Sequence, residues 1–530
     1  MFAPKELVLE DAVCLQPQLN QAFYNMKGRS HRTVLTTCEG TEMRRDAEQS
    51  RRSRFDLFIA SVIFLCLINW CAAASADWVA RYNDPANAED IPTAMALDRN
   101  GNIYVTGYVI APANGVDDIV TVKYDHNGNF QWEAFYNGPA NMSDEPVGMA
   151  VDRNGNVYVT GWSEGGSSTV DFVTIKYDTF GNQKWAVRYN EPGSTGNYPG
   201  AIAVDGSGNV FVTGSSDSKE AINSSALVTI KYDTNGNPQW VKHYNGPANG
   251  QNGGTAISVD RGGNVYVAGF SSGTSSGLDF VTIKYATYGS QKWVRRYNGP
   301  ANGDDAAQAI AIDSAGNVCA TGYSFGADAN RDFTTIKYDT NGRRQWVKRY
   351  YGPAEADNYP TAITVDPSAN VYVTGSSHAT ASSWDYATVK YTADGLTQWV
   401  RGYNGPANSD EGATAIAVDG SANVYVTGGS KGGASSSDFA TIKYDAGGRK
   451  VWVKRYTGPG NGWSAAQSLA VDRSGNVFVA GLSCQQGTWG CDFAIIRYDA
   501  NPARSFSGGV PGEGAGEPGS TSSQSEWNLN

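Results

Sequence analysis

Within the repeated part of this sequence, four tryptophans stand outside the regular pattern, and their side chains could bind a ligand. They are Trp162, Trp384, Trp463 and Trp489. Tryptophan offers a large rigid face and one polar N–H group, so such residues gathered on one surface could stack against a sugar or a peptide. The structural alternative is that each tryptophan folds over its own loop. Both interpretations stay open at this point.

A recurring aspartate could instead hold cations, because carboxylate oxygens bind Ca²⁺ and Mg²⁺. It opens a short β-like run in seven places and is replaced once, by Ala226. The seven positions are Asp118, Asp171, Asp279, Asp332, Asp385, Asp438 and Asp492. A residue with the same place in nearly every repeat is expected to cap its own loop, so we predict no metal site.

These residues belong to a pattern that recurs every 53 to 55 residues. One aspartate and one tryptophan mark each repeat. The positions are Asp98, Asp152, Asp205, Asp260, Asp313, Asp366, Asp419 and Asp472, and Trp78, Trp132, Trp185, Trp240, Trp293, Trp346, Trp399 and Trp452. Self-similarity at a fixed period of this length indicates a repeat architecture.

Each repeat predicts four strands. In the second repeat they are the run GMAVD that ends at Asp152, then Asn156–Gly161, Asp171–Asp178 and Trp185–Asn190. All four alternate with a two-residue period and are rich in Val, Ile, Thr and aromatic residues. The first and third links have Asp at the start and Gly near the end, which is typical of hairpin turns. A four-stranded antiparallel sheet follows.

The size of the side chains orders these strands around an axis. The first strand carries alanine at alternate positions, as at Ala94 and Ala96, whereas the fourth carries Trp and Tyr. Radially arranged sheets lie close together at the axis and far apart at the rim, so this order predicts an all-β fold, a β-propeller. The repeated part of the chain begins with a lone fourth strand, Trp78 to Tyr82, and ends with a third strand, Cys491 to Asp499. We therefore expect the N-terminal strand to complete the last of eight blades and to remove two open edges.

The runs AIAVDxxGNVYVTG, DFxTIKYD and WVxxYNGP resemble the bacterial SBBP-type β-propeller repeat over Trp78 to Asp499. The resemblance implies a repeat module of large exported or surface-attached proteins, and it implies no shared catalytic residues. The family name suggests seven blades, and this chain departs from that with eight.

The ends of the chain lie outside the repeats. We predict an unstructured leader over residues 1–54, with Met43 as the physiological start, and a secretory signal peptide over 55–76. The signal combines a basic flank, the apolar run Leu57–Ile68 and an Ala-Ser-Ala exit, and it is too short for a comfortable membrane span. An uncleaved anchor is the alternative. The propeller is expected over 77–499, and the Gly/Ser/Pro-rich tail over 500–530 has the composition of disorder.

Composition and cysteines agree with export. The 530 residues are 40% hydrophobic and carry a net charge of −11, without a basic patch, which argues against a nucleic-acid partner. Cys319 replaces a strand tyrosine and is expected to be a buried, inert thiol. Cys484 and Cys491 bracket a loop of the last repeat and could form a disulfide in an oxidising compartment. Two unpaired thiols are the alternative.

Catalysis finds little support in the sequence. His126, His243 and His378 fall in a turn, a rim strand and a loop of three different repeats, so they are expected not to meet. We predict no catalytic residue and no cofactor. The run from Tyr232 to Trp240 resembles the tryptophan-docking turn of eight-bladed quinoprotein dehydrogenases, although it is one residue shorter.

The function that this sequence predicts is binding. We expect a secreted, periplasmic or cell-surface propeller whose variable loops bind an extracellular glycan or protein, because rigid scaffolds usually bind through the face that bears variable loops. The mature chain is expected to have no membrane span. The alternative is a secreted propeller enzyme, such as a quinoprotein-like dehydrogenase or a polysaccharide-active enzyme.

Overall fold

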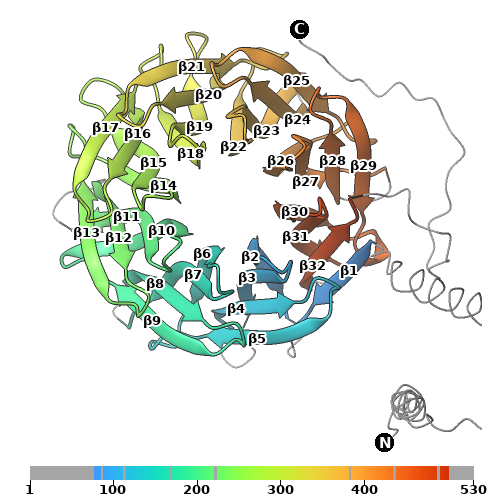
Figure 1. Cartoon of the computed structure of the whole chain (residues 1–530), viewed down its shortest axis with the longest axis horizontal. Coiled ribbons are helices and arrows are strands. Elements are labelled where there is room, and N and C mark those ends of the chain that lie inside the picture. Colours follow the sequence, from blue (N-terminus) through green and yellow to red (C-terminus); the bar gives the residue numbers. More distant parts are fainter. Residues whose placement is uncertain are drawn as a thin grey trace, which may run out of the picture. The chain divides into compact units, whose positions relative to one another are not determined.

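The strands form an eight-bladed β-propeller, as the sequence predicts (Figure 1). The computed structural model describes residues 77–500 except 85–87, 111–114, 167–168, 220–223, 381–382, 434–436 and 486–489. Each blade is a four-stranded antiparallel sheet. The predicted leader, signal peptide and tail lie outside the described residues. No helix within the described part of the chain is long and apolar enough to cross a membrane.

The strands follow the chain outward from the axis in blades 1 to 7, and in blade 8 the N-terminal strand β1 takes the outermost place. Blades 1 to 4 contain β2 (Asp90–Leu97), β3 (Ile103–Ile110), β4 (Asp117–Tyr124) and β5 (Phe130–Tyr136); β6 (Asp144–Val151), β7 (Val157–Glu164), β8 (Val170–Tyr177) and β9 (Gln183–Tyr189); β10 (Ser194–Val204), β11 (Val210–Ser218), β12 (Ser225–Tyr232) and β13 (Pro238–Tyr244); β14 (Asn252–Val259), β15 (Val265–Ser272), β16 (Leu278–Tyr285) and β17 (Gln291–Tyr297).

The same order continues through the second half of the ring. Blades 5 to 8 contain β18 (Asp305–Ile312), β19 (Val318–Phe325), β20 (Arg331–Tyr338) and β21 (Arg344–Tyr350); β22 (Asn358–Val365), β23 (Val371–Thr380), β24 (Ser383–Tyr391) and β25 (Thr397–Tyr403); β26 (Glu411–Val418), β27 (Val424–Ser430), β28 (Asp438–Tyr444) and β29 (Lys450–Tyr456); β30 (Ser464–Val471), β31 (Val477–Cys484), β32 (Cys491–Tyr498) and β1 (Trp78–Tyr82). A short 3₁₀ helix, η1 (Pro459–Asn461), precedes β30.

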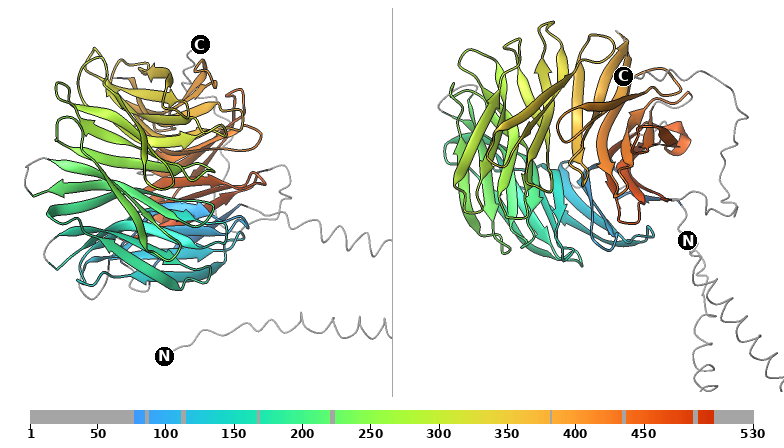
Figure 2. Two further views of the ribbon diagram at one scale, coloured as in Figure 1. Left: turned by 60° about the vertical axis from the view of Figure 1, so that its left-hand side comes forward. Right: turned by 45° about the horizontal axis from the view of Figure 1, so that its top comes forward.

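The two faces of the ring differ in their connections (Figure 2). The links between the first and second strands, and between the third and fourth, are tight hairpins on one face, which we call the turn face. The other links lie on the opposite face, which we call the variable face. In the first kind of turn, Asp98 Oδ1 accepts the backbone N–H groups of Asn100 (2.8 Å) and Asn102 (3.0 Å), and Gly101 adopts a φ of 78°.

Neighbouring blades are joined at the rim by tryptophan and lysine. Trp185 Nε1 and Lys176 Nζ of blade 2 both donate to the carbonyl oxygen of Thr234 in blade 3, at 3.1 and 2.9 Å. The Trp185 ring also lies against Gly236, whose φ is 84°. We call this arrangement the rim latch. It recurs with Trp132, Trp240, Trp293, Trp346 and Trp399 and with Lys123, Lys231, Lys284, Lys337 and Lys390.

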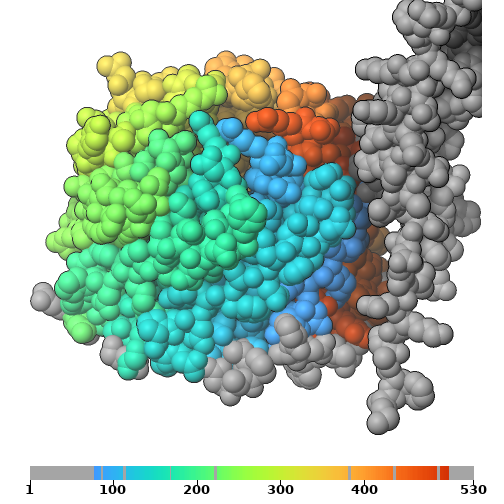
Figure 3. Space-filling model, turned by 60° about the horizontal axis from the view of Figure 1, so that its bottom comes forward, coloured from blue at the N-terminus to red at the C-terminus, as the bar shows by residue number. Residues whose placement is uncertain are grey.

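The ring closes where the two ends of the propeller meet. The N-terminal strand β1 pairs antiparallel with β32, with Trp78 opposite Arg497 and Tyr82 opposite Phe493 (Figure 1). The predicted closure is therefore confirmed. Figure 3 shows the blades of the N-terminal half, coloured blue to green, packed side by side as a continuous wall. Propeller closure removes the open sheet edges that would otherwise pair with other chains.

The rim latch predicts a severe effect of adding one methyl group. In a Gly236→Ala variant the new Cβ would lie 2.8 Å from the Trp185 ring, at a φ that favours glycine. We expect a loss of about 2 to 4 kcal/mol in the free energy of unfolding, measured by urea denaturation. Gly420→Ala is the control, because nothing lies within 4 Å of its added Cβ. Equal stability of the two variants would contradict the latch.

Candidate functional site

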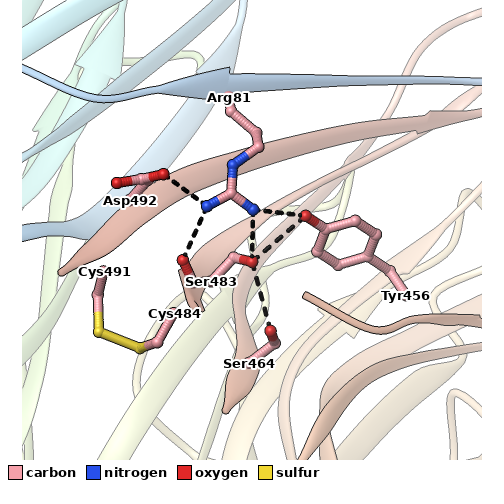
Figure 4. The surroundings of a disulfide bond; sticks show 7 residues. All are labelled: Arg81, Tyr456, Ser464, Ser483, Cys484, Cys491 and Asp492. Carbon is pink, nitrogen blue, oxygen red and sulfur yellow. Dashed lines mark hydrogen bonds and ion pairs between the residues drawn. A yellow bond between two sulfur atoms is a disulfide. The ribbon is translucent and has the colours of Figure 1, made fainter. Parts of the chain in front are cut away.

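A partly buried arginine network supports the variable face. Arg81 donates to Asp492 Oδ2 (2.5 Å), to Ser483 Oγ (2.9 Å) and O (3.1 Å), and to the hydroxyl of Tyr456 (3.0 Å), and thereby joins the strands of blade 8 to blade 7 (Figure 4). Charge-assisted bonds of a guanidinium to a carboxylate are stronger than neutral ones. The equivalent arginines are Arg188, Arg296, Arg349 and Arg455, which bond Asp171, Asp279, Asp332 and Asp438.

This network corrects one sequence expectation. The aspartates that open the third strands were expected to cap their own loops, but in the five blades that have the arginine they bond the arginine of the fourth strand. A bond within the loop occurs as well at Asp279, whose Oδ1 accepts from Ser276 Oγ at 2.7 Å. The aspartates therefore fasten strands together beneath the variable face.

Three blades carry another residue at the arginine position, namely Phe135, His243 and Gly402. In blade 6, where Gly402 stands, the Asp385 carboxyl lies beside Glu411 of blade 7. Both side chains are buried, and burial, together with the nearby Asp385, raises the pKa of Glu411 to about 8. In blade 1, burial and the neighbouring Asp144 raise the pKa of Asp118 to about 6.

Trp384 belongs to an aromatic array on the variable face of blades 5 and 6. We use this name for Tyr323, Phe325, Arg331, Tyr359 and Trp384. The rings of Tyr323 and Tyr359 lie 6.0 Å apart, and those of Tyr359 and Trp384 lie 5.6 Å apart. The Arg331 guanidinium lies 4.6 Å from the Phe325 ring and 5.4 Å from the Tyr359 ring. Four rings and one cation from the four strands β19, β20, β22 and β24 thus form one surface.

Polar groups hold the aromatic array in place. Arg331 donates to the Tyr359 hydroxyl (2.6 Å) and forms an ion pair with Asp357 (3.3 Å). The Trp384 ring stacks on His378 at 3.6 Å between ring centres, across the hairpin that joins β23 to β24. One face of Trp384 therefore does fold over its own hairpin, as the structural alternative predicts. Arg331, Tyr359 and Trp384 stay partly exposed.

The other predicted tryptophans lie apart from this array. Trp162 lies on β7, opposite Glu145 and Phe172 in the sheet of blade 2. Trp463 precedes β30 in blade 8, and 46% of its surface is exposed. Trp489 lies outside the described residues. The three of these four tryptophans that the structure describes lie at the variable face, but in blades 2, 6 and 8 rather than in one cluster.

Trp463 adjoins the two cysteines that the sequence analysis paired. Cys484 and Cys491 form a disulfide at the end of the hairpin between β31 and β32 (Figure 4). The Cys484 N–H donates to the Trp463 carbonyl oxygen at 2.9 Å. The disulfide thus anchors the segment that presents Trp463. Cys319 is fully buried, and burial raises the pKa of its thiol to about 12.

Two hollows lie on the variable face of blade 3, with volumes of about 560 and 320 Å³. The smaller one is lined by Glu191, Ser216, Asp217 and His243 among others. His243 Nε2 lies 3.2 Å from the Tyr189 hydroxyl and 3.0 Å from Glu191 Oε2. The sequence analysis placed His243 on a rim strand, and did not foresee this cluster.

The turn face also carries exposed residues that the sequence analysis missed. The hairpin aromatics Phe180 and Tyr288 are 79% and 90% exposed. At the mouth of the central channel, Arg99, Arg153 and Arg473 line a hollow of about 470 Å³. Within the part of the chain that the structure describes, no group of three His, Cys, Asp or Glu residues could hold a metal ion.

The comparisons with known proteins agree with the fold. The family described as SBBP beta-propeller repeat matches residues 77–108, 139–167, 185–220 and 345–380. A search of curated proteins found no match.

Several solved structures resemble this one distantly. They include Sqt1 of Chaetomium thermophilum (10% identity, 79% of this chain and 97% of that chain, TM-score 0.49), Drosophila Semaphorin 1b extracellular domains 1-2 (9%, 80% and 88%, TM-score 0.38) and the polysaccharide lyase Uly1 (10%, 80% and 100%, TM-score 0.41).

The buried pair of Asp385 and Glu411 predicts a stability that falls as the pH rises. The pKa of Glu411 is about 8 in the fold, against about 4.3 in an unfolded chain. A group whose pKa is higher in the folded protein than in the unfolded chain contributes its whole stabilisation below the unfolded-state pKa. This contribution is lost as the pH rises through the pKa of the folded state. We expect the free energy of unfolding to fall between pH 5 and 8 by up to about 1.4 kcal/mol per pH unit.

Urea denaturation at each pH, with Glu411→Gln beside the parent protein, tests this expectation. Glutamine keeps a donor for Asp385 but does not titrate, so the variant should show a flatter pH dependence and a higher stability than the parent at pH 8. An unchanged slope in the variant would contradict a protonated Glu411.

The disulfide predicts a mass difference that depends on reduction. Alkylation of the denatured protein should add two more groups after reduction than before it, measured by intact mass spectrometry. Equal masses in the two samples would show that Cys484 and Cys491 are free thiols.

Proposed function

The chain carries SBBP-type β-propeller repeats, and from this premise we propose that it is an exported or cell-surface binding scaffold. Its variable face takes an extracellular glycan or protein, and the glycan fits the surface better. Trp384 and Tyr359 of the aromatic array form the centre of the binding face, with Trp162, Trp463 and Trp489 as further contacts. No nucleic acid and no catalytic step are part of this proposal.

The aromatic array is the observation that carries the proposal. Its rings lie 5.6 to 6.0 Å apart along one path from β19 to β24, so neighbouring sugar units could contact successive rings. The apolar faces of pyranose rings stack well on such rigid side chains. Polar atoms adjoin the rings, because Asp357 bonds Arg331 and Asp410 Oδ1 accepts the backbone N–H of Trp384 at 3.1 Å.

The rigidity of the array favours binding. Arg331 is held by Tyr359 and Asp357 on one side and lies over Phe325 on the other. Side chains that are already fixed lose little conformational entropy when a ligand binds. The disulfide beside Trp463 likewise limits the motion of the segment that carries this second exposed ring. A disulfide also agrees with an oxidising, extracytoplasmic compartment.

A glycan array tests this proposal. Trp384→Ala should weaken binding to the recognised glycan at least tenfold, about 1.4 kcal/mol, because it removes the central stacking face. Tyr359→Ala should act in the same direction. Tyr288→Ala is the matched control, since its ring is 90% exposed on the opposite face and its loss should leave binding unchanged. Melting temperatures establish that each variant is folded.

Two outcomes would contradict the proposal. Unchanged binding after Trp384→Ala and Trp463→Ala would remove the aromatic face as the site. Turnover of an alcohol or a sugar, after addition of pyrroloquinoline quinone, calcium and an artificial electron acceptor, would favour the enzyme alternative instead.

A further inference from the structure

Blade 3 differs from its neighbours at three places that touch one another. The fourth-strand arginine is replaced by His243, and the third-strand aspartate by Ala226. Glu191 stands where the loops before six other blades have a glycine, such as Gly246, and where the loop before blade 1 has Asp84. At Gly246 an added Cβ would lie 2.0 Å from Ser271 Oγ, so a side chain at this place requires a different arrangement of the network.

The replacements open the place that the arginine fills elsewhere. In blade 4, Arg296 donates to Ser271 Oγ, to Ser271 O at 2.9 Å and to Asp279 at 2.7 Å. The corresponding serine of blade 3 is Ser216. It lines the 320 Å³ hollow together with Ala226 and His243. This volume equals that of about ten water molecules, so it can hold a long side chain.

The acceptors for a guanidinium are still present around this hollow. We call it the blade 3 pocket, with Glu191, Ser194, Ser216, Asp217, Ser225 and His243 among its lining residues. Ser216 has the same hydroxyl and carbonyl oxygens that accept hydrogen bonds from the arginine in other blades. Glu191 supplies the carboxylate that Ala226 lacks. Glu191 Oε2 already accepts a hydrogen bond from the Tyr189 hydroxyl and lies beside His243. Glu191 Oε1 is therefore left for another donor.

One buried hydrogen-bond acceptor in the surrounding sheet also lacks a donor. Asn197 lies opposite Ser216 in the pairing of β10 with β11 and is fully buried. Its Oδ1 has no hydrogen-bond partner among the described residues. Buried acceptors that lack a donor are uncommon in folded proteins. The region therefore has more acceptors than donors.

We infer that the blade 3 pocket binds the guanidinium of an arginine side chain from a partner protein or peptide. The incoming guanidinium takes the place that Arg296 and its equivalents occupy within their own blades, and it bonds Glu191, Ser216 and Asp217. This site stands on a different blade from the aromatic array, and it goes beyond the function proposed above.

Chemistry favours arginine over other ligands. Among the described residues, the pocket lining contains two carboxylates, Glu191 and Asp217, and neither lysine nor arginine. The whole chain has a net charge of −11, which attracts cationic partners. A guanidinium offers five N–H donors in a flat fork, and this shape suits several acceptors at once. An ammonium group is a point charge and should satisfy fewer of them.

Three short peptides test the inference. Each is an acetylated and amidated pentapeptide of glycines with one central arginine, lysine or citrulline, titrated into the whole protein and followed by NMR shifts of the His243 ring. We expect binding of the arginine peptide, at least fivefold weaker binding of the lysine peptide, and none of the neutral citrulline peptide.

Two variants separate the pocket from the fold. His243→Arg fills the pocket from within and restores the residue of the other blades, so it should raise the melting temperature and abolish binding, followed by calorimetry. Glu191→Gln removes one negative charge and should weaken binding at least tenfold. Trp384→Ala should leave the arginine peptide bound, which keeps this test separate from that of the aromatic array.

Three results would overturn the inference. They are equal binding of the citrulline and arginine peptides, undiminished binding by the folded His243→Arg variant, and no binding of the arginine peptide by the parent protein. Binding of a neutral methyl pyranoside in place of the peptide would assign the pocket to sugars instead.

Discussion

The contact of a rim tryptophan with the turn of the next blade is the interaction on which this ring depends. Two donors, one indole N–H and one lysine ammonium, converge on a single carbonyl oxygen, as at Thr234. The indole face also needs a glycine at positive φ, so the turn and the tryptophan fix each other. Each hydrogen bond contributes only about 1 kcal/mol, but the latch recurs around the rim and joins blades 1 to 7 in series. Between blades 8 and 1, Trp78 Nε1 is buried with no acceptor among the described residues, but the Trp78 ring still lies against Gly128. The pairing of β1 with β32 completes blade 8 itself.

A rim held in this way allows the variable face to change one blade at a time. The arginine network beneath that face lies within one blade and its neighbour, as Arg81 with Asp492 and Tyr456 illustrates. Replacing its members in blade 3 opens a pocket, whereas replacing the arginine with Gly402 in blade 6 leaves a buried carboxylate pair. Contacts in repeat folds are mostly between nearest neighbours, so neither change needs compensation across the ring.

The fold could be predicted from the sequence because each of its determinants repeats. The two-residue alternation defines the strands, the Asp and Gly of the turns define the hairpins, and the alanine and tryptophan positions define inside and outside. The lone strand Trp78–Tyr82 defines the closure. All of these are local or periodic signals. The aromatic array is different, because Tyr323, Arg331 and Tyr359 come from two blades, and no periodic signal brings them together.

The blade 3 pocket has a signal in the sequence that the sequence analysis did not use. Aligning the fourth strands places arginine in five of eight blades and exposes Phe135, His243 and Gly402 as exceptions. Only His243 coincides with the loss of the aspartate, at Ala226. A loop carboxylate accompanies the exceptions of blades 3 and 1, at Glu191 and Asp84. A missing arginine alone leaves a buried aspartate, and in blade 6 this aspartate, Asp385, raises the pKa of the neighbouring Glu411 together with burial. Losing the arginine and the aspartate together leaves an uncharged space, and the added Glu191 makes that space selective for a cation. A site suited to a guanidinium is therefore most easily formed in a repeat that has lost its own arginine.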